Sequence, residues 1–145
     1  MQYPSLQRLV DQSSRIVFFG GAGVSTESGI PDFRSPNGLY NQPYTYPYPP
    51  EQMISRSFFD AHPAEFFEFY FERMIATQAK PNKAHLKLAE LESRGILSAV
   101  ITQNIDGLHQ AAGSKNVLEL HGSVLRNYCM RCGRSFGLDD VQIGR

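Results

Sequence analysis

The chain has 145 residues, and its 14 basic and 14 acidic side chains cancel to a formal net charge of zero. A neutral balance provides no general attraction for nucleic acid or for an anionic membrane, so we expect neither as a partner. No apolar run approaches the roughly 20 residues that span a bilayer, and the N-terminus lacks the pattern of a secretion signal. The sequence therefore predicts a cytoplasmic protein of about one domain.

The first elements are a short helix and a strand. Leu6, Leu9 and Val10 recur at helical spacing, which predicts an amphipathic helix over residues 5–14. The strand is expected at 15–19, where β-branched and aromatic residues form an apolar run of the length of a buried strand. A strand of this kind needs cover on both of its faces.

A glycine-rich loop follows this strand. Gly20, Gly21 and Gly23 permit positive φ and leave room for a phosphate beside the backbone. Residues 25–28 are candidates for the cap and first turn of a helix that would point its positive end at the loop, as in pyrophosphate sites. Thr26 occupies the third glycine position of a dinucleotide fingerprint, so that fingerprint is incomplete. A tight turn after a core strand is the open alternative.

Residues 35–50 are rich in proline, asparagine, glycine and tyrosine, which excludes a regular helix or a central strand. This stretch is either an irregular surface loop or a mobile lid over a cofactor. A short helix is expected at 51–59 and a longer one at 62–78, opened by Pro63. Because aromatic residues at 66–71 cover more than one side of the longer helix, it should lie between two layers.

A further helix is expected from Pro81 to Gly95, with its apolar stripe at Ala84, Leu88 and Leu91. The stripe should face the core, because apolar residues at this spacing share one helix face. Three histidines are expected to serve only as a helix cap or to lie on a helix face: His62, His85 and His109.

Two more strands are expected, at 96–102 and 117–120, separated by a short helix at 105–112. Strands that alternate with helices predict parallel pairing and an α/β fold. Parallel strands all end at the same edge of a sheet, which is where open α/β proteins bind their ligands. Side chains that follow these strands are therefore candidates for a site.

Polar residues stand at that edge. Gln103, Asn104 and Asp106 follow the second strand, and His121 follows the third. A histidine has an ordinary pKa of about 6.5, which suits a general base near neutrality. The alternative is structural: Asp106 would cap the next helix, and His121 would have no chemical role.

Three separate segments resemble the signatures of the sirtuins, which are NAD-dependent protein deacylases. They are GAGVSTESGIPDFR at 21–34, TQNID at 102–106 and ELHG at 119–122, in the family's order. The resemblance implies an α/β fold: an incomplete Rossmann-like parallel sheet, an inserted helical module and the first half of a zinc-ribbon module. It implies four segments: the first βα unit with the cofactor loop at 1–56, the helical module at 57–95, the strands with the catalytic motifs at 96–124, and the start of the zinc module at 125–145.

The resemblance also implies the reaction. NAD would be a consumed co-substrate that takes the acyl group from a lysine of a substrate protein, with release of nicotinamide. The catalytic residues would be His121 as general base, with Asn104 and Asp106. The residues implied to bind NAD are Gly21, Ala22, Gly23, Thr26, Asp32, Phe33, Arg34, Tyr40, Gln103, Asn104, Asp106 and His121.

Two other functions remain open. A Rossmann-type oxidoreductase would place an acidic residue on the adenine ribose about 20 residues after the glycines, and residues 41–50 contain none. A catalytically incomplete nucleotide-binding fragment is the alternative outside the enzymes. The chain lacks the second Cys-x-x-Cys and the further strands of a sirtuin core, so we expect it to correspond to the N-terminal part of such a core.

Two residues bear on which acyl group would be removed from the lysine. Tyr70 and Arg73 lie three positions apart on one helix face and resemble the Tyr-x-x-Arg of the desuccinylase branch of the family. Thr26 and Asp32 argue against that branch, which tends to carry Ala and Thr there. A core tyrosine beside a surface arginine is the plain alternative, so deacetylation remains the first expectation.

The two cysteines of the chain form one Cys-x-x-Cys motif, at Cys129 and Cys132. The motif resembles half of a zinc ribbon, and tetrahedral zinc needs four ligands. In sirtuins the zinc is structural, and the other two ligands lie downstream. A redox dithiol is the alternative. We expect zinc in the full-length parent and weak or no zinc binding by these residues alone.

Overall fold

The computed structural model describes residues 4–143, and its centre is a parallel sheet of three strands. β1 (Ile16–Gly20), β2 (Leu97–Thr102) and β3 (Val117–Glu119) lie in the order β1-β2-β3. Both pairs are parallel. The expected α/β class and the three parallel strands are therefore confirmed, with strand ends shifted by one residue.

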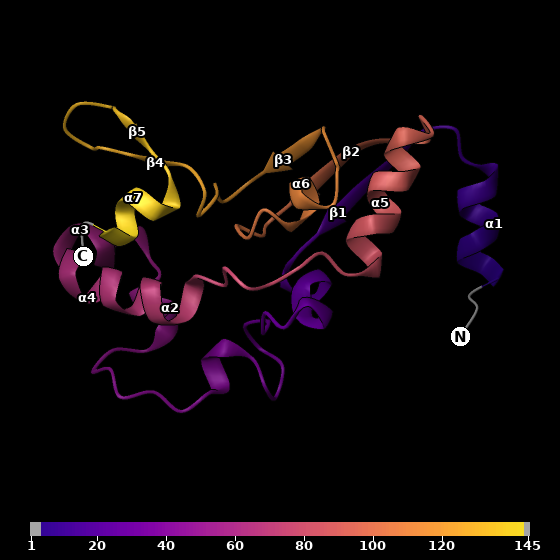
Figure 1. Cartoon of the computed structure of the whole chain (residues 1–145). Helices are drawn as coiled ribbons and strands as arrows, with labels where there is room; N and C mark the ends of the chain where they lie inside the picture. The colour runs from indigo at the N-terminus through magenta and orange to yellow at the C-terminus, as the bar shows by residue number, and fades with distance from the viewer. Residues whose placement is uncertain (1–3, 144–145) are drawn as a thin grey trace.

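One face of this sheet is covered by α5 (Lys83–Ser93) (Figure 1). Leu91, Leu97 and Val100 form the buried cluster between helix and sheet, and Phe18 packs against it. The helix begins after Asn82, not at Pro81, because the Asn82 side chain caps it. This start also turns His85 into the core and leaves Ala84 exposed, so the expected stripe was wrong at Ala84.

The opposite face of the sheet is apolar and open. Val17, Phe19 and Leu118 are 56%, 61% and 50% exposed. The register aligns Phe19 with Ile101, and Ile101 with Leu118, so these side chains share one face. Buried parallel strands normally have both faces covered, and within residues 4–143 this face has no such cover.

α1 (Pro4–Gln12) is a helix at the periphery, at the right of Figure 1. Its existence was predicted, but none of its described residues is buried, and Leu6 and Leu9 face solvent. Only Val10 packs against the cluster beneath α5. α6 (Leu108–Ala111) is shorter than expected, because Gly107 with φ of 74° delays its start.

A helical module lies on the other side of the molecule (Figure 1). It contains α2 (Pro50–Met53), α3 (Arg56–Ala61), α4 (Pro63–Phe69) and the π-helical turn η3 (Tyr70–Met74). The single helix expected at 51–59 is two helices, because Ser55 is extended and its hydroxyl accepts the Phe58 N–H. The next helix ends at Met74 rather than at residue 78, where Ile75 takes up extended backbone.

The module has its own core of Leu39, Met53, Phe58 and Phe69. Leu39 belongs to η2 (Leu39–Asn41), a single turn within the proline- and tyrosine-rich stretch. This core anchors the middle of that stretch on the helices. The aromatic helix α4 packs on one side against this buried cluster through Phe69, whereas Phe67 lines an open groove. Its all-round apolar pattern had predicted a position between two layers.

The last elements are a short hairpin and a helix. β4 (Asn127–Tyr128) pairs antiparallel with β5 (Ser135–Phe136), and α7 (Leu138–Ile143) follows. Figure 1 shows α7 beside α3 and α4, with the hairpin above them. Phe136, Phe67 and Phe71 line a shallow groove between these parts. No helix in the described residues is long and apolar enough to cross a membrane.

Candidate functional site

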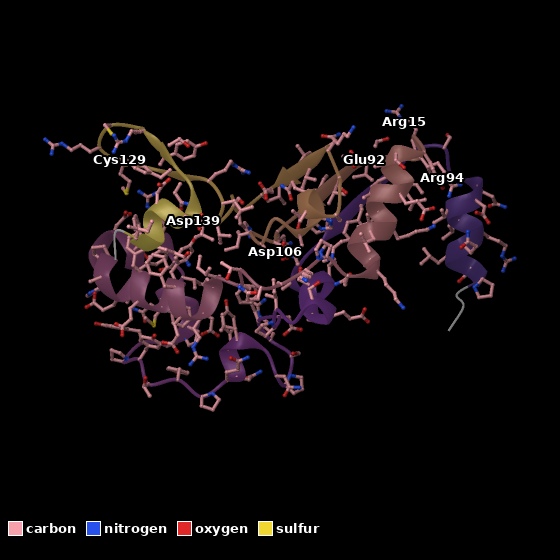
Figure 2. All side chains as sticks on the ribbon, viewed as in Figure 1. Arg15, Glu92, Arg94, Asp106, Cys129 and Asp139 are labelled. Atoms are coloured by element: carbon pink, nitrogen blue, oxygen red, sulfur yellow. The ribbon has the colours of Figure 1, made fainter. Side chains whose placement is uncertain are left out.

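A cavity of about 580 Å³ lies at the carboxyl ends of the strands and reaches to η3 of the helical module. In Figure 2, Asp106 lies near the middle of the molecule, between the sheet and the helical module. Segments from four parts of the chain contribute to the lining. The lining includes these residues predicted from the sequence: Ala22, Phe33, Arg34, Tyr40, Tyr70, Arg73, Gln103, Asn104, Asp106 and His121.

The glycine loop does not use the positive φ that its glycines permit. Positive φ occurs at Gly29 (85°) but not at Gly20, Gly21 or Gly23. A Cβ on Gly20 would lie 2.5 Å from Phe18 Cε1, so close packing requires this glycine. A Cβ on Gly23 would meet nothing within 4 Å. Since neither strain nor crowding requires Gly23, its open space remains available to a ligand.

The helix after the loop is the 3-10 helix η1 (Ala22–Ser28), with Gly21 as its cap. It therefore starts earlier than residues 25–28, where the cap was expected. Val24 N donates to Gly21 O at 3.0 Å, which leaves the N–H groups before Val24 without partners inside the helix. Such groups at a positive helix end favour a negatively charged ligand.

Ser25 joins this helix to the end of β2. Its hydroxyl donates to Asp106 Oδ2 at 2.6 Å and accepts from Asn104 Nδ2 at 3.0 Å. Ser25 is 1% exposed. It was one of the candidates for the cap or first turn of the helix, but the cap is Gly21 and Ser25 lies inside η1. Its partner Asp106 stands 81 residues away, so no local pattern in the sequence indicates this bond.

Asp106 is bonded both to η1 and to the start of α6. Its Oδ2 accepts from Ser25, and its Oδ1 accepts the Leu108 N–H at 2.9 Å at the start of α6. The carboxylate therefore both caps the turn before α6 and borders the cavity. Because both oxygens are bonded, the side chain has one fixed orientation.

His121 borders the cavity from the end of β3. Its Nδ1 lies 3.0 Å from Gln103 O. A carbonyl oxygen only accepts, so in the neutral ring Nδ1 carries the proton and Nε2 keeps its lone pair. Gln103 N in turn donates to Gly20 O at 3.0 Å, so the β1–β2 pairing fixes the carbonyl that orients the histidine.

The segment at 32–40 is an ordered turn beside the cavity. Tyr40 N donates to Phe33 O at 3.0 Å, and the two rings pack with centroids 5.3 Å apart. The Arg34 guanidinium lies 5.7 Å from the centre of the Tyr40 ring. Hydrogen bonds from Ser35 lower the pKa of Asp32, whose Oδ1 accepts the Ser35 N–H at 2.9 Å.

Four of the predicted cofactor residues are not among those that line the cavity: Gly21, Gly23, Thr26 and Asp32. The Thr26 hydroxyl donates to Gly23 O at 2.9 Å, so it stabilises the turn from within. The Asp32 carboxylate likewise stabilises its own loop, by accepting the Ser35 N–H. Their proposed contacts with a cofactor remain predictions.

Tyr70 and Arg73 line the cavity together, from the π-helical turn η3. Arg73 Nη1 donates to Gln42 Oε1 at 3.3 Å, and Nη2 donates to Pro43 O at 3.2 Å. Arg73 Nε lies 2.9 Å from Glu72 Oε1, as an ion pair in which the N–H makes no hydrogen bond. Burial raises the pKa of Tyr70. The guanidinium is thus engaged by the tyrosine-rich stretch and by Glu72.

Cys129 and Cys132 are free thiols on the turn of the β4–β5 hairpin. Figure 2 shows Cys129 on this hairpin, well away from Asp106. Cys129 N donates to Arg134 O at 2.9 Å, and backbone hydrogen bonds from Cys132 and Arg131 lower the pKa of the Cys129 thiol. Within residues 4–143, no cluster of three or more metal-binding side chains occurs. The pair therefore offers two of the four ligands that zinc needs.

The fold and this cavity place the chain among the open α/β proteins that bind ligands at the carboxyl ends of parallel strands. The particular family follows from comparison with known proteins. A profile described as the Sir2 family matches residues 21–143. The chain belongs to the Sir2 family, as the three sequence signatures predicted.

Similar proteins include bacterial deacetylases. The chain is 64% identical over 136 residues to an NAD-dependent protein deacetylase of Clostridium acetobutylicum, covering 94% of this chain and 56% of that protein. It is 50% identical over 134 residues to the NAD-dependent protein deacetylase of Thermotoga maritima, covering 92% of this chain and 52% of that one. The chain thus spans about half the length of the curated relatives that it matches.

Solved Sir2 structures match as well. One contains a deacetylated p53 peptide with 3'-O-acetyl ADP-ribose; it has a TM-score of 0.88, 46% identity, and coverage of 99% of this chain and 56% of that chain. Another is a Sir2 mutant with a p53 peptide and NAD, with a TM-score of 0.82, 44% identity, and coverage of 99% and 54%. The fold of this chain is therefore that of the corresponding part of the Sir2 structures.

Proposed function

We propose that the chain carries the NAD site and the general base of an NAD-dependent protein-lysine deacetylase. The observation that supports this most strongly is the convergence of segments from 22–34, 103–106 and 121 on one cavity of about 580 Å³. The relatives that are 50–64% identical are named as deacetylases of this kind. Because the chain spans about half of their length, the activity is a proposal for this chain.

The chain's own residues suit the separate tasks of this reaction. NAD, when bound, supplies the ribose carbon that accepts the acyl oxygen as nicotinamide leaves. The free N–H groups of the glycine loop would hold its pyrophosphate, and Phe33 would shield the reacting carbon from water. Asn104 and Asp106, locked by Ser25, would hold the nicotinamide end. The proton transfer would fall to His121.

His121 would act through Nε2. The hydrogen bond between Nδ1 and Gln103 O keeps the proton on Nδ1, so Nε2 has the lone pair that could accept a proton. It would take a proton from a ribose hydroxyl of bound NAD, which would make that oxygen the acceptor of the acyl group. With one water consumed, the acyl group would end on ADP-ribose and the lysine would be released as an amine.

An acetyl group fits the site better than a negatively charged acyl group. Recognition of succinyl would need a free guanidinium, and that of Arg73 is bonded to Gln42 and Pro43 and paired with Glu72. Moving Arg73 to an anion would break these bonds, at a cost of about 1 kcal/mol for each hydrogen bond. We therefore keep deacetylation ahead of desuccinylation.

We also propose that Cys129 and Cys132 provide two thiolates to a structural zinc. The backbone hydrogen bonds that lower the pKa of Cys129 favour the thiolate that zinc requires. Gly133, with φ of 71°, and its N–H bond of 2.8 Å to Cys129 O give a tight turn that brings the two residues together. The other two ligands would come from outside this pair.

The experiment combines turnover with binding. The chain is incubated with NAD and an acetyl-lysine peptide, mass spectrometry follows the peptide and acetyl-ADP-ribose, and calorimetry measures NAD binding. We expect NAD binding but only slow formation of both products, because the chain spans about half the length of its relatives. His121→Ala should bind NAD and give almost no product. NAD binding without product would favour the nucleotide-binding alternative. Absence of NAD binding would contradict the proposal.

A further inference from the structure

A polar junction lies behind the cavity, where η1, α5 and α6 meet. Its centre is Asn82, whose side chain acts in two directions. Asn82 Oδ1 accepts the Ala84 N–H at 2.9 Å and the His85 N–H at 3.4 Å, which caps α5. Asn82 Nδ2 donates to Val24 O at 2.7 Å and to Ser28 Oγ at 3.0 Å, which holds η1. One amide therefore ties the glycine-loop helix to α5.

His85 extends this junction toward the site. Its Nδ1 accepts the Asn82 N–H at 3.2 Å and so completes a capping box. The ring is fully buried, and its centroid lies 4.7 Å from that of buried His109. Among the described residues, neither His85 Nε2 nor either ring nitrogen of His109 has a hydrogen-bond partner. The two rings therefore act by packing, with His109 on α6, three residues after Asp106.

The junction thus holds both sides of the Ser25–Asp106 bond. Asn82 bonds Val24 and Ser28, the residues that bracket Ser25 in η1. His85 packs against His109, the second residue of α6, and Asp106 accepts the N–H of Leu108, the first residue of α6. If η1 moved away from α5, Ser25 would lose its bonds of 2.6 Å and 3.0 Å to Asp106 and Asn104. The positions of Asp106 and Asn104, which line the cavity, therefore depend on the distance between η1 and α5.

We propose that Asn82 is a positioning residue that, together with the His85–His109 pair, sets η1 against Asp106 and keeps the cavity ready for NAD. It does not touch the cavity, and it would act through Val24, Ser28 and Ser25. The consequence for NAD rests on the proposed function. The consequence for the position of η1 is independent of that proposal, because it follows from the hydrogen bonds alone.

The test separates the two directions of the Asn82 side chain. Asn82→Asp keeps an oxygen that caps α5 as well as asparagine does, but it removes both N–H donors to η1. Asn82→Ala removes both functions. Ser55→Ala is the matched control, because it removes an N-cap bond from α3, far from η1. Amide hydrogen exchange is measured for the peptide at 22–30 and for α5, and calorimetry gives the Kd for NAD.

We expect Asn82→Asp to speed exchange at 22–30 by about tenfold or more, the effect of losing a bond or two. Protection of α5 and the melting temperature should stay near wild type, while the Kd for NAD rises by about tenfold. Ser55→Ala should leave both readouts unchanged. Wild-type exchange at 22–30 in Asn82→Asp would overturn the proposal. If the wild type does not bind NAD, the proposed function fails, and the exchange result still decides the role of Asn82.

Discussion

The cavity and the β4–β5 hairpin hold the two chemical motifs of the chain, and they are built differently. The cavity joins segments far apart in sequence through buried hydrogen bonds, such as that of 2.6 Å between Ser25 and Asp106. The hairpin has strands of two residues each, and its Cys132 is exposed. The first site is fixed by the fold itself, whereas the second has few contacts to fix it. Substitutions at the cavity should therefore change NAD binding and product formation, whereas substitutions at the hairpin should leave both unchanged.

The largest effect is expected from His121→Ala. Loss of a general base lowers rates by about 10²–10⁴-fold. His121 is exposed and makes one hydrogen bond, to Gln103 O, so the fold and the Kd for NAD should change little. Product formation measured by mass spectrometry, beside circular dichroism, checks this. A rate within threefold of wild type would remove His121 from the mechanism.

Gly23→Val should come next. A Cβ at Gly23 meets no protein atom within 4 Å, so the fold should tolerate the change. The branched side chain would instead occupy the space through which a pyrophosphate approaches, and we expect the Kd for NAD to rise at least about tenfold.

Gly133→Val in the hairpin is the matched comparison. Gly133 has φ of 71°, which a branched residue rarely adopts, so this change should disturb the hairpin and leave NAD binding alone. Calorimetry on both variants measures the contrast. Equal effects of the two substitutions on NAD affinity would erase the distinction between the two regions.

Ser25→Ala should destabilise the fold by about 1–3 kcal/mol, because it leaves Asp106 Oδ2 and Asn104 Nδ2 without their partner in a buried place. Thr26→Ala is the control from the same helix. Its hydroxyl is exposed and, among residues 4–143, bonds Gly23 O alone, so its effect should stay within about 0.5 kcal/mol. Urea unfolding gives both values, and equal values would show that the Ser25 network carries no stability.

The pH dependence of stability should be the smallest effect. Burial lowers the pKa of His85 and of His109 below the ordinary 6.5, although Asp106, and Glu119 near His109, oppose the shift. Below pH 6.5 the two histidines therefore bind protons more readily in the unfolded chain than in the folded one. The free energy of unfolding keeps its full value above pH 6.5 and falls as the pH drops below it. Unfolding free energies from pH 7.5 to 5.5 measure this. His109→Leu should give a flatter curve, and an identical slope would contradict the assignment.

The sequence predicted those parts that depend on local patterns. The run at 16–19 and the alternation of strands and helices were enough for the parallel sheet, and the three signatures marked most of the cavity lining. A local interaction also explains a helix boundary that the sequence did not predict. The break at Ser55 depends on one hydroxyl, which accepts the Phe58 N–H and starts a new helix.

Other features could not be predicted, because they depend on pairs distant in sequence. The Ser25–Asp106 bond links residues 81 positions apart. His85 and His109 were expected on helix faces, and only the packing of α5 against α6 shows that they are buried against each other. Likewise, the bonds of Arg73 to Gln42 and Pro43 arise from a loop whose path no periodicity describes.

The central claim is that one NAD site is formed by 21–34, 103–106 and 121, apart from the hairpin at 127–136. Amide hydrogen exchange with and without saturating NAD tests it most directly, since it reports each segment in one experiment. We expect slower exchange at 21–34 and 103–106 when NAD is present, with no change at 127–136. Protection of the hairpin, or no protection of the two cavity segments, would contradict it.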